Sequence, residues 1–298
     1  MAQTVLILGA NGRFGRNAAQ AFAKAGWDVR PFDRSKDRLR EAVHGVQVIV
    51  NAWNPQYFDW AAQVPKLHDE VIAAAKMVDA TVIVPGNVYV YGAQTPSPWG
   101  VTTPHQAENP LGQIRRDMER AYRFSEVRTI ILRAGDFIDT EASGNWFDMI
   151  MTSKIGRGVL TYPGKRDVDH AWAYLPDLCR AAVMLAEKRD QLNRFEDVPF
   201  PGYTLTGNDM AQALEQCLRR NFKVKSMAWW AIQLAAPVWK LALHLLEMRY
   251  LWNTSHRLDS ARFEELLPEF EPTELHKALA SALPESAVPQ KAMSTQTI

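Results

Sequence analysis

The sequence has few cysteines, almost no net charge and no long apolar run. Among its 298 residues are only two cysteines, Cys179 and Cys217, which cannot build a disulfide framework and suit a reducing, cytoplasmic location. Its 34 basic and 33 acidic residues leave a formal charge of +1, without the basic excess of a nucleic-acid binder. The first apolar stretch, Thr4 to Leu8, is too short for a secretory signal, so we expect no targeting segment.

Motifs of several common catalytic centres are also missing. There is no H-E-x-x-H or C-x-x-C pair, no P-loop and no G-x-S-x-G nucleophile elbow. The seven histidines are scattered without the spacing of metal ligands. We therefore expect no bound metal and neither serine-hydrolase nor P-loop chemistry.

Short apolar strands alternate with helices through the first half of the chain. Strands are expected at 5–8, 27–32, 47–50, 81–84 and 129–132. Helices are expected between them at 16–25, 36–43, 64–78 and 112–124. Unalternating apolar strands between helices are typical of a parallel sheet covered on both faces. The pattern predicts an α/β fold with a doubly wound parallel sheet of six or seven strands.

A glycine-rich turn joins the first strand to the first helix. Gly9 permits a tight turn, Gly12 lets backbone N–H groups approach a pyrophosphate, and Gly15 lets the helix pack close to the sheet. Asp33 lies 24 residues after Gly9, where a carboxylate can hold the ribose hydroxyls of NAD, whereas the following Arg34 can bind the 2′-phosphate of NADP. The turn predicts a dinucleotide site, with NAD slightly favoured over NADP.

The G-x-x-G-x-x-G spacing resembles the extended short-chain dehydrogenase/reductase superfamily, in its NAD-dependent epimerase/dehydratase group. Val90–Gly92 resembles the V-Y-G of that family, and Asn109–Gly112 resembles its N-P-Y-G. Leu132–Asp136 is similar to its L-R-P-G-N, and residues 173–178 are similar to its F-V-H-V-D-D-L region. The likeness covers about residues 3–280 and is most specific in the first 135. It implies a Rossmann sheet, NAD or NADP as cofactor and a small-molecule substrate.

The catalytic set of this family is degenerate here. In the family a Ser or Thr, a Tyr and a Lys act together, and the tyrosine transfers a proton while hydride moves at the nicotinamide. The matching positions hold Asn87, Leu111 and Arg115. Leucine cannot move a proton and arginine stays charged, but Arg115 can still donate to ribose hydroxyls and Asn87 to a carbonyl. The resemblance therefore implies retained cofactor binding, with proton transfer lost or relocated.

A replacement acid has four candidates near the ends of the central strands. Tyr89 follows the fourth strand with the same parity as Asn87, and we select it. For Tyr91, Asp136 and His170 the structural interpretations are favoured: packing, a helix cap or loop carboxylate, and a satisfied core histidine.

The predicted site is assembled from these arguments. Its catalytic residues are Asn87, Arg115 and Tyr89. Its cofactor-binding residues are Gly9, Asn11, Gly12, Arg13, Phe14, Gly15, Asp33, Arg34, Asn51, Ala52, Trp53, Pro85, Gly86 and Arg115. For Trp53, a pocket wall and core packing are equally supported.

The pattern changes after Asp136. Helices are expected at 146–153, 175–187, 206–219 and 227–251, with a strand at 159–162. We assign 1–139 plus about 171–189 to the NAD(P)-binding Rossmann domain. A smaller, mainly helical substrate-binding part takes about 140–170 plus 190–282, and 283–298 is a flexible tail.

A tryptophan-rich segment occupies 227–252. Charged residues interrupt it and Pro237 divides it, so its apolar stretches are too short to span a bilayer. The favoured interpretation is a helical pair over the substrate pocket or in a dimer contact. Membrane-surface contact through 228–251 is the less favoured alternative.

Two functions are compatible with these features. The first is an NAD(P)-binding oxidoreductase or epimerase-like enzyme that acts on a small carbonyl or hydroxyl substrate by hydride transfer, without the family's tyrosine. The second is a non-catalytic dinucleotide-binding redox sensor or assembly scaffold. Membrane-associated lipid or quinol handling ranks third. A homodimer is the default expectation for the assembly, and no nucleic-acid partner is expected.

Overall fold

A six-stranded parallel sheet forms the centre of the chain. The computed structural model describes residues 2–284, and the remainder of the expected tail, 285–298, lies outside them. The strand order is β2-β1-β3-β4-β5-β9, and every neighbouring pair is parallel. The strands are β1 (Thr4–Leu8), β2 (Asp28–Phe32), β3 (Val48–Asn51), β4 (Thr81–Gly86), β5 (Thr129–Arg133) and β9 (Phe195–Pro199). The α/β class and the doubly wound sheet are confirmed.

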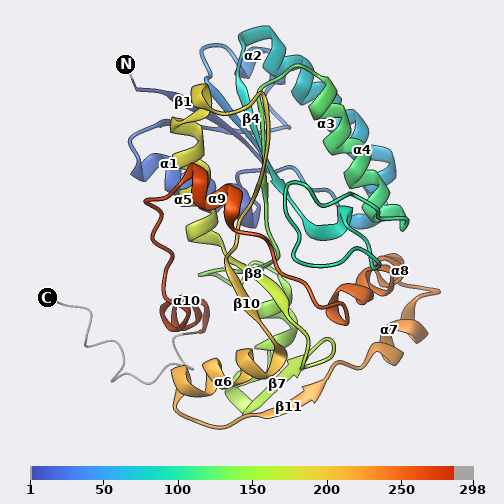
Figure 1. Cartoon of the computed structure of the whole chain (residues 1–298). Helices are drawn as coiled ribbons and strands as arrows, with labels where there is room; N and C mark the ends of the chain where they lie inside the picture. The colour runs from blue at the N-terminus through green and yellow to red at the C-terminus, as the bar shows by residue number, and fades with distance from the viewer. Residues whose placement is uncertain (1, 285–298) are drawn as a thin grey trace, which may run out of the picture.

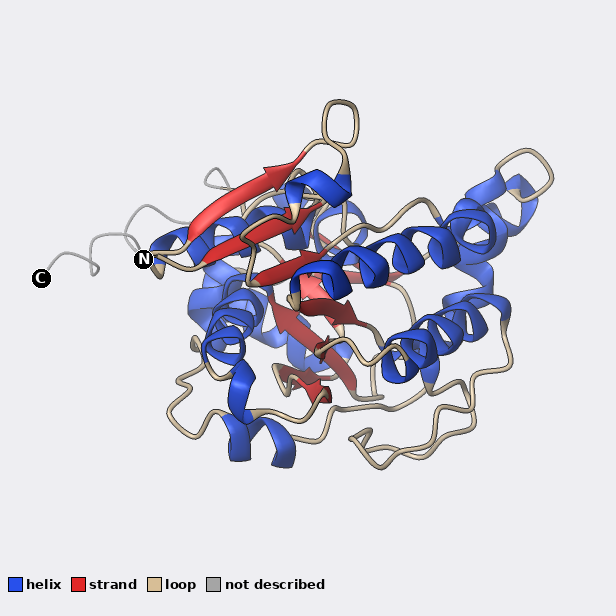
Figure 2. Cartoon of the chain, turned by 90° about the horizontal axis from the view of Figure 1, so that it is seen from above, coloured by secondary structure: helices blue, strands red, loops and turns tan. Residues whose placement is uncertain are grey.

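Helices cover both faces of this sheet, as Figures 1 and 2 show. One face carries α1 (Arg13–Lys24) and α5 (Leu175–Glu187), which pack against each other. The other face carries α2 (Leu39–Ala42), α3 (Trp60–Val78) and α4 (Pro110–Phe124). The expected helices 16–25, 36–43, 64–78 and 112–124 are therefore present, although α1, α3 and α4 begin earlier and α2 is shorter.

The central strands have no polar face because both of their faces are buried, whereas the edge strand β2 exposes Asp28, Arg30 and Pro31. In β1, Val5 and Ile7 enter the core beneath α1 and α5, whereas Leu6 and Leu8 enter the core beneath α3 and α4. Each aliphatic side chain buried in this way stabilises the fold by roughly 1.5–3 kcal/mol relative to exposure. Period-two alternation is accordingly missing from the sequence.

A second part of the molecule lies below the sheet in Figure 1 and has its own apolar core. It contains a sheet of order β10-β8-β6 and a two-stranded sheet of β11 and β7. The strands are β6 (Asp136–Ile138), β7 (Val159–Tyr162), β8 (His170–Tyr174), β10 (Tyr203–Leu205) and β11 (Lys223–Ser226). Its helices are α6 (Gly207–Leu218) and α10 (Leu275–Ala282). The expected helix 146–153 is a short π-helical turn, η3 (Phe147–Met151).

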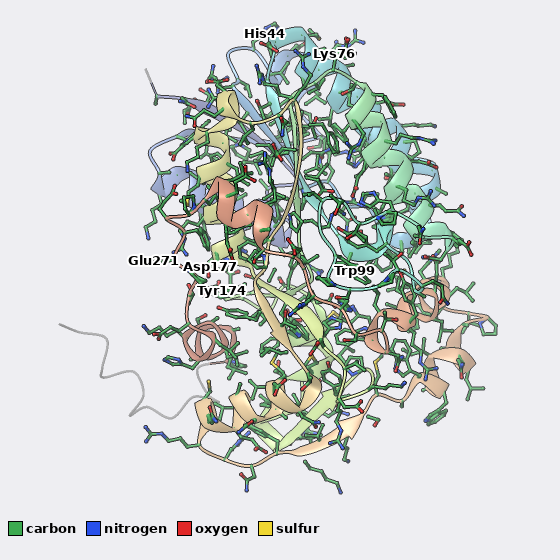
Figure 3. The ribbon with its side chains drawn as sticks, viewed as in Figure 1. His44, Lys76, Trp99, Tyr174, Asp177 and Glu271 are labelled. Carbon is green, nitrogen blue, oxygen red and sulfur yellow. The ribbon has the colours of Figure 1, made fainter. Side chains whose placement is uncertain are left out.

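The two parts are joined where β8 runs directly into α5. Tyr174 and Asp177, labelled in Figure 3, connect this junction to the C-terminal segment 273–281. The Asp177 carboxylate accepts hydrogen bonds from the N–H and hydroxyl of Thr273 at 2.6 and 2.8 Å, and the Tyr174 hydroxyl lies 2.8 Å from that of Ser281. Leu283, expected in the flexible tail, is buried against this second core.

The sixth strand, β9, was not predicted. Its sequence contains two acidic residues, Glu196 and Asp197, both buried. Each has a cationic partner, because Arg262 of α9 (Ala261–Leu266) binds Glu196 at 2.8 Å and Arg133 binds Asp197 at 2.7 Å. Residues 195–199, expected within the substrate-binding part, thus complete the parallel sheet.

The tryptophan-rich segment forms two short helices divided at Pro237. These are α7 (Trp229–Ala235) and α8 (Lys240–Glu247), followed by the 3₁₀ turn η6 (Met248–Trp252). Two further 3₁₀ turns that matter for the site are η1 (Tyr57–Asp59) and η2 (Val88–Val90). The turn η4 (Ile155–Arg157) precedes β7, and η5 (Arg189–Gln191) precedes β9. Within residues 2–284, no helix combines the length and apolar character needed to cross a bilayer.

Candidate functional site

The direction of strand addition reverses between β1 and β3, and open α/β sheets bind ligands in the crevice at the carboxyl ends of the strands at such a switch point. Gly9 follows β1 with φ +78°, and a Cβ there would lie 2.9 Å from the Ala52 carbonyl oxygen. A Cβ on Gly15 would lie 2.2 Å from the Gly9 carbonyl oxygen. Side chains are therefore excluded from both positions, and the backbone forms the floor of the crevice.

The helix α1 points its N-terminus into this crevice. Its N-cap is Gly12, and no side chain caps it, so first-turn N–H groups are available to an anion. Asn11 is exposed at the turn, whereas the Phe14 side chain is buried in the core and only its backbone can contact a ligand. The Arg13 guanidinium donates to the Gly144 carbonyl at 2.9 Å.

Asp33 and Arg34 lie beside Trp53 at the outer end of the crevice. The Asp33 carboxylate accepts from the N–H and hydroxyl of Ser35 at 2.9 and 2.7 Å, and Lys36 lies 3.1 Å away. These bonds lower the pKa of Asp33 to about 2, so it is anionic at neutral pH. The Arg34 guanidinium lies 5.2 Å from the centre of the Trp53 ring. An acid for ribose hydroxyls and a cation for a 2′-phosphate are thus both within the site.

Asn51 is turned away from the crevice. Its amide lies 3.2 Å from Nδ1 of His68 and donates to the Tyr122 hydroxyl at 3.1 Å, in a buried polar cluster beneath α3 and α4. Burial lowers the pKa of His68 to about 3, which keeps the ring neutral. The side chain of Asn51 is therefore part of the core. Of the predicted cofactor-binding residues Asn51, Ala52 and Trp53, only the last two border the glycine turn.

Arg115 and Asn87 lie at the carboxyl end of β4, close to Pro85 and Gly86. Arg115 is buried, donates to the Pro85 carbonyl at 2.7 Å, and leaves its Nε without a partner. Burial lowers its pKa. The Asn87 Oδ1 accepts from the Tyr89 N–H at 3.1 Å, so its amide nitrogen is the group left to donate.

Tyr89 is paired with a second tyrosine that sequence reasoning missed. The hydroxyls of Tyr89 and Tyr57 lie 2.7 Å apart and join η2 to η1. Burial raises the pKa of both phenols, and the negative charge of Asp136 adds to this effect. The only sequence signal for Tyr57 is its position in the loop that follows β3, at the carboxyl edge of the sheet.

Asp136 and His170 form an ion pair or hydrogen bond of 2.7 Å near this edge. The His170 ring stacks on Trp252 with centroids 4.2 Å apart, and its Nδ1 has no partner. Tyr91, by contrast, is fully buried and stacks on Trp99 at 4.8 Å, in agreement with its packing interpretation.

Leu111, which the sequence resemblance matches to the family's tyrosine, is fully buried. It belongs to the same apolar cluster as Met248 and Leu251 of η6. The Glu247 carboxylate of α8 accepts from the Leu111 N–H and from the Asn109 amide, each at 2.7 Å. The end of the tryptophan-rich segment therefore covers the N-terminus of α4.

One cluster within residues 2–284 has the composition of a metal site, namely His105, Glu119 and Asp197. The Arg133 guanidinium already lies between the two carboxylates, at 2.8 Å from Glu119 and 2.7 Å from Asp197. It supplies the positive charge that the carboxylates require, so the cluster is explained as a buried ion-pair network.

Comparisons with known proteins agree on the fold. No family model matches the sequence, and no curated protein matches it. Among solved structures, a UDP-glucose 4-epimerase from Brucella ovis in complex with NAD is 17% identical over 97% of this chain and 99% of that one, with a TM-score of 0.72. A nucleoside-diphosphate-sugar epimerase from Pseudomonas aeruginosa is 17% identical over 95% and 96%, also with a TM-score of 0.72. TunA, an NAD-dependent NDP-hexosamine 5,6-dehydratase, is 16% identical over 94% and 96%, with a TM-score of 0.71. The chain thus has the fold of NAD-dependent sugar epimerases and dehydratases.

Proposed function

We propose that the chain is an NAD(P)-binding oxidoreductase or epimerase-like protein that acts on a small carbonyl or hydroxyl substrate by hydride transfer. The observation that carries the proposal is the glycine turn at the β1/β3 crevice, where Gly9 and Gly15 exclude side chains next to the open N-terminus of α1. Proteins of the same fold in complex with NAD or UDP-sugars support both the cofactor and a substrate rich in hydroxyls. NAD is favoured because Asp33 is anionic beside the crevice.

The residues of the turn fit a dinucleotide. The first-turn N–H groups of α1 would hold the pyrophosphate, Asp33 the adenosine ribose, and Arg115 the nicotinamide ribose. Bound NAD(P) would accept or return the hydride. The amide of Asn87 would donate to the substrate oxygen, because its carbonyl oxygen is already held by the Tyr89 N–H.

The Tyr57–Tyr89 pair is the proposed source of the proton. Because burial raises the pKa of both phenols, they stay protonated at neutral pH and can protonate only an oxygen more basic than themselves, such as the alkoxide left when a carbonyl accepts hydride. When the Tyr57 hydroxyl donates to the Tyr89 oxygen, it leaves the Tyr89 O–H free to point toward the substrate. The reverse step, removal of a proton, requires Tyr89 to lose its proton against these shifts, and Arg115 is the adjacent cation that favours it.

A second function, dinucleotide binding without catalysis, is favoured by one observation. The position that acts as the acid in the family holds Leu111, buried beneath Glu247 and Met248. A redox sensor or assembly scaffold needs only the glycine turn, whereas an enzyme also needs the relocated acid.

The first experiment is a titration of nucleotide-free protein with NADH and with NADPH, followed by energy transfer from tryptophan to nicotinamide. We expect micromolar binding, tighter for NADH. Asp33→Ala should lower the affinity for NADH by about tenfold, or about 1.4 kcal/mol. Arg34→Ala should lower the affinity for NADPH and leave that for NADH unchanged. Asp190→Ala, an exposed carboxylate elsewhere, is the matched control. Failure of folded protein to bind either nucleotide would refute both functions.

The two functions are then separated by turnover. Nucleotide sugars and small alcohols are screened with the preferred cofactor, and the wild type is compared with Tyr89→Phe and Tyr57→Phe. Loss of turnover in Tyr89→Phe with an unchanged NADH affinity supports the relocated acid. Unchanged turnover in that variant rules Tyr89 out, and tight binding without turnover of any substrate favours the sensor or scaffold.

A further inference from the structure

The helix pair α7–α8 presents a concentrated apolar surface to solvent. Ten large apolar side chains are exposed within residues 2–284, and five of them lie between positions 230 and 243. These five, which we call the apolar tip, are Trp230 at 65% exposure, Leu234 at 73%, Val238 at 90%, Trp239 at 42% and Leu243 at 60%. Single exposed apolar residues are ordinary, but a contiguous group on one short hairpin marks a contact surface.

The hairpin is held firmly on its other side. Trp229 and Ile232 are buried, and the Trp229 indole donates to the Pro163 carbonyl at 2.5 Å. In α8, Ala242 is buried and Glu247 is bound to the N-terminus of α4. Figure 1 shows α7 and α8 at the margin of the molecule, beside the sheet's carboxyl edge. The exposed face is thus the outer side of a packed element, with a fixed position relative to the body.

The segment of the chain that contains the tip has an excess of basic residues. Residues 219–252 contain six basic side chains and one acidic one, although the whole chain has a net charge of only +1. Within the described residues none of the six makes an ion pair; they are Arg219, Arg220, Lys223, Lys225, Lys240 and Arg249. The one acid, Glu247, is directed toward α4, and the neighbouring turn η1 adds only Asp59.

We propose that the apolar tip docks on an anionic lipid surface, without spanning it. Aliphatic and tryptophan side chains enter the boundary between headgroups and acyl chains, where the amphipathic indole ring is favoured. Lysines without an ion-pair partner lie at the start of α8, directly after Trp239, and on β11, the strand that precedes α7, and acidic headgroups attract them. An exposed apolar hairpin preceded by a lysine-bearing strand selects an acidic bilayer, because an ordinary protein interface is depleted of lysine.

Docking would bring the candidate site close to the bilayer. The turn η1 packs against α8, and the ring of Tyr57 lies 6.4 Å from that of His244. The side chain proposed to orient Tyr89 therefore contacts the same helix that carries Leu243. Lipid docking does not depend on nucleotide binding, so the two proposals can fail separately.

The test is sedimentation of the full chain with vesicles of phosphatidylcholine alone or mixed with phosphatidylserine. We expect binding to the mixed vesicles, weakened by salt. The combined variant Trp230→Ser, Leu234→Ser and Val238→Ser should reduce the affinity at least tenfold. Replacing Lys223, Lys225 and Lys240 by glutamine should reduce it about 100-fold, at about fivefold for each lysine near the surface. The control variant Met77→Ser with Phe124→Ser removes exposed apolar residues elsewhere and should bind the vesicles with the affinity of the wild type.

Two further measurements make the outcome decisive. Brominated lipids should quench tryptophan fluorescence in the wild type and less in Trp230→Phe with Trp239→Phe. Analytical ultracentrifugation without lipid should give the same mass for the wild type and the triple serine variant. Absence of vesicle binding, undiminished binding of that variant, or loss of a lipid-free dimer in it would each overturn the proposal, and the last would assign the tip to a second copy of the chain.

Discussion

Two helix N-termini, those of α1 and α4, lie at the carboxyl edge of the same sheet and are treated in opposite ways. The α1 terminus has a glycine N-cap and no side-chain cap, so its N–H groups are open. The α4 terminus is closed by Glu247 and covered by apolar side chains of η6. Backbone donors open to an anion at α1 and a capped, buried terminus at α4 are thus separated along one edge of the sheet.

The largest expected effect comes from a substitution at the closed N-terminus of α4. Leu111→Ala removes a fully buried side chain and should lower the free energy of unfolding by about 2–5 kcal/mol. NADH affinity of the folded protein should stay within about twofold, because α1 is untouched. Denaturant unfolding measures the first value and nucleotide titration the second. Leu243→Ala on exposed α8 is the matched control, with a change within about 0.5 kcal/mol. A large loss of nucleotide affinity in Leu111→Ala would contradict the separation.

The next effect is at the open end. Gly15→Ala places a Cβ 2.2 Å from the Gly9 carbonyl oxygen, so the turn must move, at a cost of about 3 kcal/mol. Nucleotide affinity should fall by more than about tenfold, a further difference from Leu111→Ala. Gly156→Ala is the control, because a Cβ there meets no atom within 4 Å. If Gly15→Ala binds NADH like the wild type, the glycine turn is not the cofactor site.

Acid should lower the free energy of unfolding through the buried cluster of His68, Asn51 and Tyr122. His68 is hydrogen-bonded to Asn51, the last residue of β3, and to Tyr122 of α4, and burial lowers its pKa to about 3. The unfolded chain takes up a proton below about pH 6.5 while the folded chain does not, so stability is complete above that pH and is lost as the pH falls toward 3. Between pH 7 and 5 the loss should be about 2 kcal/mol.

This prediction is checked by comparing pH profiles of unfolding. His68→Gln should have a flatter profile than the wild type, whereas the exposed His44→Gln should follow the wild type. Parallel profiles for the wild type and His68→Gln would show that His68 is not held neutral by the fold.

The smallest expected effect comes from weakening the side-chain cap of α4 while its apolar core is left intact. Glu247→Gln keeps the shape of the cap but removes its charge from the bonds to Leu111 and Asn109, at about 1 kcal/mol. Exposed Glu70→Gln is the control. Denaturant midpoints distinguish the two, and equal midpoints would mean that the charge of Glu247 contributes nothing to closing α4.

The strands β1, β3, β4 and β5 could be predicted because they are buried on both faces and therefore largely apolar. β9 could not, because its two carboxylates are neutralised by Arg133 and Arg262, which are distant in sequence. The glycine turn was predictable from local backbone demands alone. Tyr57 was not, because its pairing with Tyr89 depends on how η1 and η2 meet in space. Asn51 was placed in the cofactor site by its position after a strand, but its direction is set by His68 and Tyr122.

The charges of β9 also fix the alignment of the sheet's last strand. Glu196 and Asp197 are consecutive, so they point to opposite faces, and each meets an arginine on its own face. A slip of one residue would exchange the faces and leave two buried carboxylates and two guanidinium groups without partners. Apolar strands tolerate such errors more easily. At the open edge of this sheet, ionic pairing therefore selects a single register and makes the strand a poor template for a second chain.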